Sequence, residues 1–169
     1  GSGNDTYLLG AGSDSVFDSS GADDKIVSSI SRSLKSYSGI ENLTLEGTGN
    51  IKGQGNDKAN DIVGNKGRNE LKGHGGDDVL VGGGGADVLY GCSGKDRFDF
   101  NAASEIGKAS GKRDIIRDFK HGEDRIDLKS IDANSKTAAN DAFKFVAAEG
   151  AKFTGVAGQL IWDQMNYAG

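Results

Sequence analysis

Polar and apolar positions recur along the first hundred residues with a period of nine. An acid or amide occupies every ninth position at Asn60, Asn69, Asp78, Asp87 and Asp96. A large apolar side chain follows each of them two residues later, at Ile62, Leu71, Leu80, Leu89 and Phe98. The residue two positions before is glycine in four of the five cases and Lys58 in the other. Because glycine has no Cβ, these positions can turn sharply.

Short turns alternating with strands of about three residues predict a solenoid, not a hairpin sheet. Two nonapeptides then form one coil, and each apolar residue stacks on the residue eighteen positions away. The predicted fold class is all-β: a right-handed parallel β-roll, or β-solenoid, with a small C-terminal α+β cap.

The same repeat occurs at the N-terminus, but its third copy is shifted. The segments 1–7 and 10–16 place Asp5 and Asp14 nine residues apart. The strict period then selects Asp23, which would put a lysine in the core, whereas Asp24 puts Ile26 there after one inserted residue. Since a shift of one residue exchanges the two faces of a strand, the core favours Asp24 and the period favours Asp23. Both remain candidates.

Composition and charge change near Phe100. Of 28 glycines, 21 lie in residues 1–100, which also hold 15 acids against 10 bases. The roll is therefore predicted at residues 1–100 and the cap at residues 101–169.

Within the roll we expect metal-binding tracts at 1–25 and 55–100 and metal-poor coils at 26–54, with strands at 26–30 and 40–45. In the cap we expect a strand at 115–119, a turn at 120–124, a return strand at 125–128, a helix near 138–142 and a strand at 159–162.

The charge and the missing motifs exclude several function classes. An acidic roll repels phosphate backbones and anionic lipid but attracts divalent cations, and no apolar run is long enough to span a membrane. The single Cys92 excludes an intrachain disulfide. No His-Glu-x-x-His motif is present, and both histidines lie in predicted turns, so we do not expect an enzyme.

Calcium fits these turns because it prefers six to eight oxygen ligands from carboxylates and carbonyls. The nonapeptide Gly-Gly-x-Gly-x-Asp-x-apolar-x strongly resembles that of the RTX (repeats-in-toxin) proteins, which bind calcium. The resemblance implies that each ion takes the carbonyls of positions 2 and 4 and the Asp of one turn. The turn eighteen residues later supplies the carbonyls of positions 1 and 3 and its own Asp.

Position by position, the resemblance implies four sites for several calcium ions. The first joins Asp78 and Asp96 through the carbonyls of His74, Gly76, Gly91 and Ser93. The second joins Asn69 and Asp87 through Asn65, Gly67, Gly82 and Gly84. The third joins Asn60 and Asp78 through Asn56, Lys58, Gly73 and Gly75. The fourth joins Asp5 to Asp23 or Asp24 through Gly1 and Gly3. An amide replaces a carboxylate in the second site, which should weaken it, and in the third site Lys58 replaces glycine at the position that must turn.

The segments 114–119 and 122–128 resemble the C-terminal domain of serralysin-type secreted proteases. Together the resemblances imply an extracellular calcium-binding module that folds outside the cell and supports secretion and stability of a larger protein through the type I secretion machinery. They also imply that the native C-terminus lies beyond Gly169. The alternative is a polysaccharide-binding module of an extracellular carbohydrate-active enzyme.

Overall fold

The computed structural model describes residues 2–12, 14–18, 21, 23–102, 104–105, 113–131, 144–145 and 159–160. They divide into two compact units, Gly1–Leu128 and Lys129–Gly169. All the regular secondary structure in the described residues is β-strand. None of these residues lies in a helix long and apolar enough to cross a membrane.

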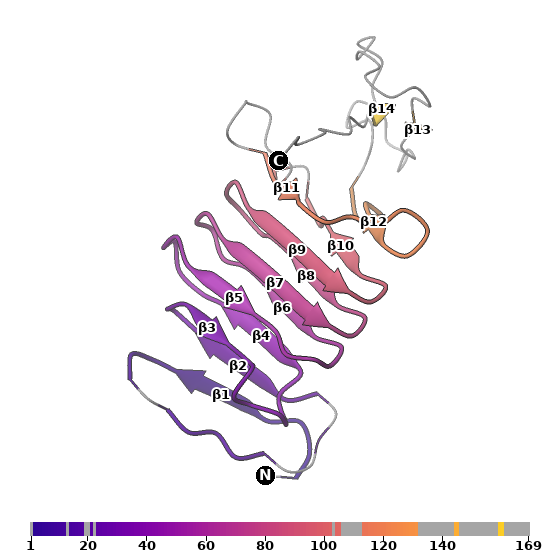
Figure 1. The fold of residues 1–169 in the computed structure, drawn as a ribbon. Coiled ribbons are helices and arrows are strands. Elements are labelled where there is room, and N and C mark those ends of the chain that lie inside the picture. The colour runs from indigo at the N-terminus through magenta and orange to yellow at the C-terminus, as the bar shows by residue number, and fades with distance from the viewer. Residues whose placement is uncertain are drawn as a thin grey trace, which may run out of the picture. The chain divides into compact units, whose positions relative to one another are not determined.

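The first unit consists of two parallel sheets whose strands follow one another in chain order (Figure 1). One sheet has the order β1 (Thr6–Leu9), β2 (Lys25–Ser28), β4 (Asn42–Leu45), β6 (Asp61–Val63), β8 (Val79–Val81), β10 (Arg97–Asp99) and β12 (Arg125–Asp127). The other has the order β11 (Ile115–Ile116), β9 (Val88–Ser93), β7 (Glu70–Gly75), β5 (Lys52–Gln54) and β3 (Arg32–Ser33). The predicted parallel β-roll is confirmed.

The core consists of apolar side chains stacked from coil to coil. Leu80 pairs with Ile62 on one side and Phe98 on the other, and Leu71 pairs with Leu89. All five are completely buried, as the nine-residue period predicts. Each buried side chain of this size contributes about 1.5–3 kcal/mol relative to an exposed one. The stack therefore holds successive coils in one register.

The segment predicted to form metal-poor coils continues this stack. Its expected strands are observed as β2 and β4, which pair in parallel and place Ile26 opposite Leu43. Gly53 of β5 lies where the next strand of its sheet has Leu71. A Cβ on Gly53 would lie 3.1 Å from Leu71 and 3.3 Å from Leu43, so glycine allows the two sheets to approach closely here.

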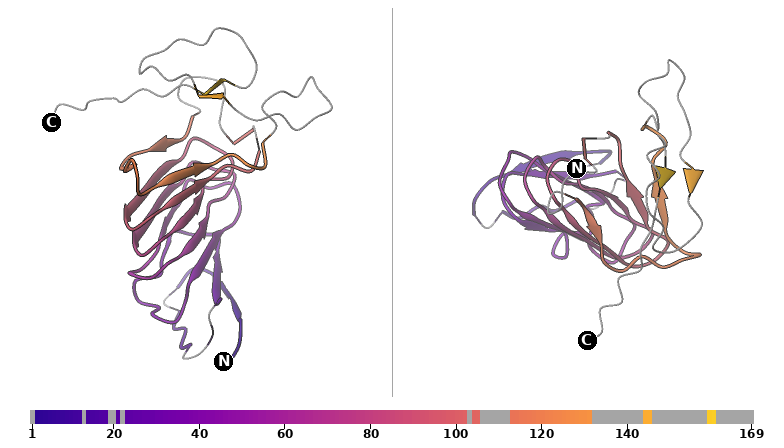
Figure 2. Two further views of the ribbon diagram at one scale, coloured as in Figure 1. Left: turned by 90° about the vertical axis from the view of Figure 1, so that its right-hand side faces the viewer. Right: turned by 90° about the horizontal axis from the view of Figure 1, so that it is seen from above.

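The predicted strand and return strand after residue 100 both form, but they do not pair with each other. Instead β11 pairs with β9, and β12 pairs with β10, so both continue the sheets of the roll (Figure 2). The register of β12 brings Ile126 opposite Phe98. The expectation that they belong to a separate α+β cap is wrong in this respect, because both continue the Asp-x-apolar pattern of the coils. The two sheets of the roll thus extend to Asp127.

The second unit contains β13 (Lys144–Phe145) and β14 (Gln159–Leu160), which pair in parallel. The strand predicted at 159–162 is therefore present at its first two residues. The helix predicted near 138–142 lies outside the described residues.

Candidate metal centre

One buried aspartate per turn links each coil to the coil before it. Asp78, Asp87 and Asp96 are at most 1% exposed, and each lies one residue before a strand. Their Oδ1 atoms accept the backbone N–H groups of the residues eighteen positions earlier, at 2.8, 2.7 and 3.0 Å respectively. One carboxylate oxygen of each side chain therefore has a structural role.

The second oxygen of each carboxylate has no hydrogen-bond partner in the described part of the chain. The buried and unpartnered Oδ2 atoms include those of Asp24, Asp78, Asp87, Asp96 and Asp114. Leaving a buried acceptor unpaired costs about 1–3 kcal/mol, and more if it is charged. These oxygens are the atoms that a cation would satisfy.

Glycine makes room for these oxygens. A Cβ on Gly73 would collide with Asp78 Oδ2 and would lie 2.8 Å from the Gly91 carbonyl oxygen. An oxygen from each of two successive turns thus borders the same small space. This is the arrangement that calcium needs, because it collects carboxylate and carbonyl oxygens from both sides.

The pKa values of these carboxyl groups reflect their burial. Loss of solvation raises the pKa of Asp78 to about 8 and that of Asp87 to about 7. The same cause raises the pKa of Asp114 to about 6 and also raises the pKa of Asp96. Backbone hydrogen bonds to Oδ1 oppose these shifts but do not reverse them. Without a cation, the turns therefore tend to retain protons.

The first predicted site, between Asp78 and Asp96, is brought together. Besides the Asp78 N–H bond to Asp96, the Ser93 hydroxyl donates to the His74 carbonyl at 3.3 Å. His74 lies opposite Cys92 in the paired strands β7 and β9, and both have a positive φ, 82° and 73°. The two turns are therefore stacked as the repeat predicts.

The second predicted site brings Asn69 to Asp87, and Asp87 has a further partner in the next coil. Asp87 donates its backbone N–H to Asp114 Oδ1 at 2.8 Å. A Cβ on Gly82 would lie 2.7 Å from Asp87 Oδ2 and 3.3 Å from Asp114 Oδ2, so both free oxygens border one space. The sequence analysis missed Asp114, although it follows Asp87 by three periods and precedes Ile116 by two residues.

The last coil contains a similar aspartate that the sequence analysis missed. Asp96 donates its backbone N–H to Asp124 Oδ1 at 3.0 Å, across 28 residues. Asp124 Oδ2 accepts the N–H of Lys120, and the ammonium group of Lys120 donates to the Cys92 carbonyl at 2.7 Å. The positively charged side chain of Lys120 therefore binds one carbonyl of this turn, that of Cys92.

The asparagines proposed as ligands are brought to their predicted neighbours but already have hydrogen bonds. Asn60 Oδ1 accepts the N–H of Asn56 at 2.7 Å, and Asn69 Oδ1 accepts that of Asn65 at 2.8 Å. The carbonyls of Asn56 and Asn65, also expected as ligands, accept the N–H groups of Gly75 and Gly84. The expected carbonyls of Gly73 and Gly82 do lie close to these amides. A Cβ on Gly55 would collide with both Asn60 Oδ1 and the Gly73 carbonyl oxygen, and a Cβ on Gly64 with both Asn69 Oδ1 and the Gly82 carbonyl oxygen.

The N-terminal coil brings together three carboxylates. Ligand oxygens of Asp5, Asp18 and Asp24 lie within 4.8 Å of one another. Asp24 is fully buried, and its Oδ1 accepts the Asp5 N–H at 2.7 Å, as in the later turns. A Cβ on Gly21 would lie 2.5 Å from the Gly3 carbonyl oxygen and would collide with Asp24 Oδ2.

Asp24, and not Asp23, occupies the repeated buried position. Asp23 is exposed, and its Oδ1 accepts a hydrogen bond from the Asn42 amide at 3.1 Å. Asp18 lies outside the repeat pattern, and its carboxylate accepts a hydrogen bond from the hydroxyl of Tyr7, which raises the pKa of Tyr7 to about 12. Gly1 lies outside the described residues.

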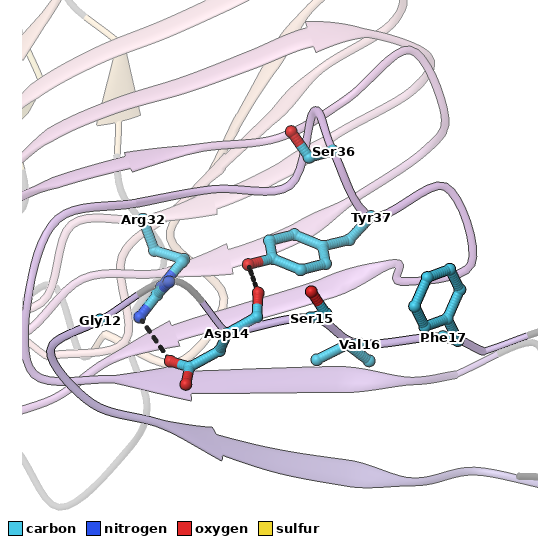
Figure 3. Close-up of a pocket in the computed structure, with 8 residues that line it drawn as sticks. All are labelled: Gly12, Asp14, Ser15, Val16, Phe17, Arg32, Ser36 and Tyr37. Carbon is cyan, nitrogen blue, oxygen red and sulfur yellow. Dashed lines mark hydrogen bonds and ion pairs between the residues drawn. The ribbon is translucent and has the colours of Figure 1, made fainter.

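A shallow pocket beside this coil contains a second side-chain cation. Its lining residues include Asp14, Phe17, Arg32 and Tyr37 (Figure 3). Arg32 donates to the Gly10 carbonyl at 2.7 Å and forms an ion pair with Asp14 at 3.7 Å. The Tyr37 hydroxyl donates to the Asp14 carbonyl at 3.0 Å. Asp14, the carboxylate of this N-terminal repeat, is thus paired with the Arg32 side chain.

Two family models match the chain. The model for the serralysin C-terminal region of peptidase M10 matches residues 49–168, and that for the RTX calcium-binding nonapeptide repeat (4 copies) matches residues 1–24. Both describe non-catalytic parts of proteins. No curated protein matches the chain.

Proposed function

The chain belongs to the serralysin C-terminal family of peptidase M10, and on this basis we propose that it folds on binding extracellular calcium and supports the secretion and stability of a larger secreted protein. Both matched regions are typical of secreted proteins, and the RTX repeat binds calcium. The observation that carries the proposal is the series of buried Oδ2 atoms, in Asp24, Asp78, Asp87, Asp96 and Asp114, that have no hydrogen-bond partner among the described residues.

Two groups of residues would hold the ions. In the C-terminal coils they are Asp78, Asp87, Asp96 and Asp114, with carbonyls from the glycine-rich turns, including that of Gly91. In the N-terminal coil they are Asp5, Asp18 and Asp24 with the Gly3 carbonyl. Calcium supplies the positive charge that these buried oxygens need and binds oxygens of neighbouring turns at about 2.3–2.6 Å.

Calcium concentration would control when the roll forms. Without the ion, buried aspartates and the entropy of 28 glycines both oppose folding. Extracellular modules bind calcium at about 10⁻⁴ to 10⁻³ M, far above cytosolic levels. The chain would therefore pass the type I secretion machinery in a less folded state and complete its fold outside, where calcium binding contributes directly to folding.

A calcium titration of the full chain tests this proposal. Circular dichroism should show a gain of β-structure that saturates with calcium and reverses with a chelator. Asp78→Asn should weaken the response, whereas Asp77→Asn removes the same charge from the neighbouring exposed side chain and should leave the response unchanged. Equal effects of the two substitutions, or no response to calcium, would contradict the proposal.

A further inference from the structure

Four buried asparagines connect the glycine-rich coils to the coils before them. The Nδ2 atoms of Asn56, Asn60, Asn65 and Asn69 make six hydrogen bonds, of 3.0–3.4 Å, to the carbonyls of Tyr37, Ile40, Glu41, Glu46, Gly49 and Ile51. All four side chains are at most 8% exposed. We call this set the asparagine seam.

Two members of the seam occupy the same place in the turn as the unpartnered carboxylates. Asn60 and Asn69 lie at the repeat position that holds Asp78, Asp87 and Asp96 in the later coils. Asn60 and Asn69 accept an N–H with Oδ1 and donate with Nδ2, whereas each aspartate keeps one oxygen without a partner in the described residues. The same repeat position thus holds a hydrogen-bonded amide in the earlier coils and a carboxylate with one unpartnered oxygen in the later coils.

The preceding coil explains the difference. Behind Asp78 and Asp87 lie the N–H groups of Asn60 and Asn69, which a carboxylate can accept. Behind Asn60 and Asn69 lie the carbonyls of Glu41 and Ile51, which accept hydrogen bonds from the two amides. The N–H of Glu41 is already donated to the Asp24 carbonyl at 3.2 Å. A carboxylate there would face other oxygens and would require a cation between them, whereas a neutral amide satisfies the carbonyls directly.

Arg32 does the same at the opposite end of this region. It lies eighteen residues after Asp14, and its guanidinium group contacts the Asp14 carboxylate (Figure 3). The same group donates to the Gly10 carbonyl, as a bound cation would bind it. The intervening coils enclose an apolar core, with Leu34, Ile40, Leu43, Leu45, Ile62 and Leu71 at most 2% exposed.

We propose that residues 32–71 form a calcium-independent centre of the roll, in which the asparagine seam and Arg32 take the place of ions. Calcium would then be required only in the N-terminal coil and in the coils from Asp78 onward. This inference rests on the proposed calcium binding of the aspartate turns. It assigns Asn60 and Asn69 a role that excludes the ion, in contrast to their expected role as weaker ligands.

Hydrogen exchange of the full chain, in chelator and in calcium, tests the inference without any substitution. The amides of β4 and β6 should be protected under both conditions, and those of β8 and β10 only with calcium. If β4 and β6 are unprotected in chelator while calcium protects the whole roll, the inference fails and the proposed function stands. If calcium leaves β8 and β10 unprotected, the proposed function fails.

A double substitution tests the seam itself. Asn60→Asp with Asn69→Asp replaces two donors by carboxylates. Exchange of β4 and β6 in chelator should then become at least about tenfold faster, since the buried Glu41 and Ile51 carbonyls lose these donors. Asn50→Asp is the matched control, because Asn50 is exposed and uses only its oxygen, to accept the Arg68 N–H. Unchanged exchange in the double variant would overturn the inference.

Discussion

Asp78→Asn should stabilise the chain in chelator and lose most of that advantage in calcium. In chelator at pH 7, Asp78 must take up a proton or remain charged and buried, because burial raises its pKa to about 8. About three powers of ten separate pH 7 from the ordinary pKa of an aspartate, and each costs about 1.4 kcal/mol, so this burden is at most about 4 kcal/mol. An asparagine avoids it, and its amide can donate toward the Gly91 carbonyl that borders the same space.

In calcium most of this difference should disappear. An ion at 100 times its dissociation constant stabilises the folded state by about 2.7 kcal/mol, and the variant loses most of this because a ligand charge is gone. Urea unfolding followed by circular dichroism at pH 7 measures both conditions. We expect the variant to be more stable than the original chain in chelator, by about 2–4 kcal/mol, and this advantage to shrink by about 2–3 kcal/mol in calcium. Lower stability of the variant in both conditions would refute this account of Asp78.

Three further predictions concern pH, the N-terminal site and the core. Because burial raises the folded-state pKa of Asp78, Asp87 and Asp114, the ion-free roll should be most stable near pH 4 and lose stability as the pH rises through 6 to 8; thermal unfolding in chelator that is insensitive to pH would contradict this. Asp24→Asn should weaken calcium binding by the N-terminal coil, as calorimetry can measure, whereas Asp23→Asn should not, because Asp23 is exposed. Leu80→Ala should destabilise the calcium-bound roll by about 2–5 kcal/mol in urea unfolding, since Leu80 is completely buried between Ile62 and Phe98; a loss below about 1 kcal/mol would show that the stacked core contributes little.

The period of nine was sufficient to predict the core, because the apolar residue of each turn has to face inward wherever the coil repeats. It was insufficient after residue 100. Asp114 and Asp124 continue the columns of Asp87 and Asp96, but 27 and 28 residues separate them instead of eighteen. The pattern Asp-x-apolar survives the longer connection, so the local motif was a better guide than the spacing.

The role of the asparagines could not be predicted from their own positions. As ligands, asparagine and aspartate differ in charge, and the repeat alone treats one as a weaker version of the other. Which is suitable depends on whether the preceding coil presents an N–H or a carbonyl, and that depends on backbone geometry eighteen or nineteen residues away. The choice between Asp23 and Asp24 was simpler, since burial of Ile26 decides it.

The order of the strands also has a mechanical consequence. Each coil is bonded only to the coils on either side, so a force applied along the roll would load one rung of hydrogen bonds at a time. The roll should then peel from an end in steps, and a coil of eighteen residues would release about 60 Å of chain. Calcium would raise the force needed at the coils with unpartnered carboxylates, and the asparagine seam would resist pulling equally well with and without the ion.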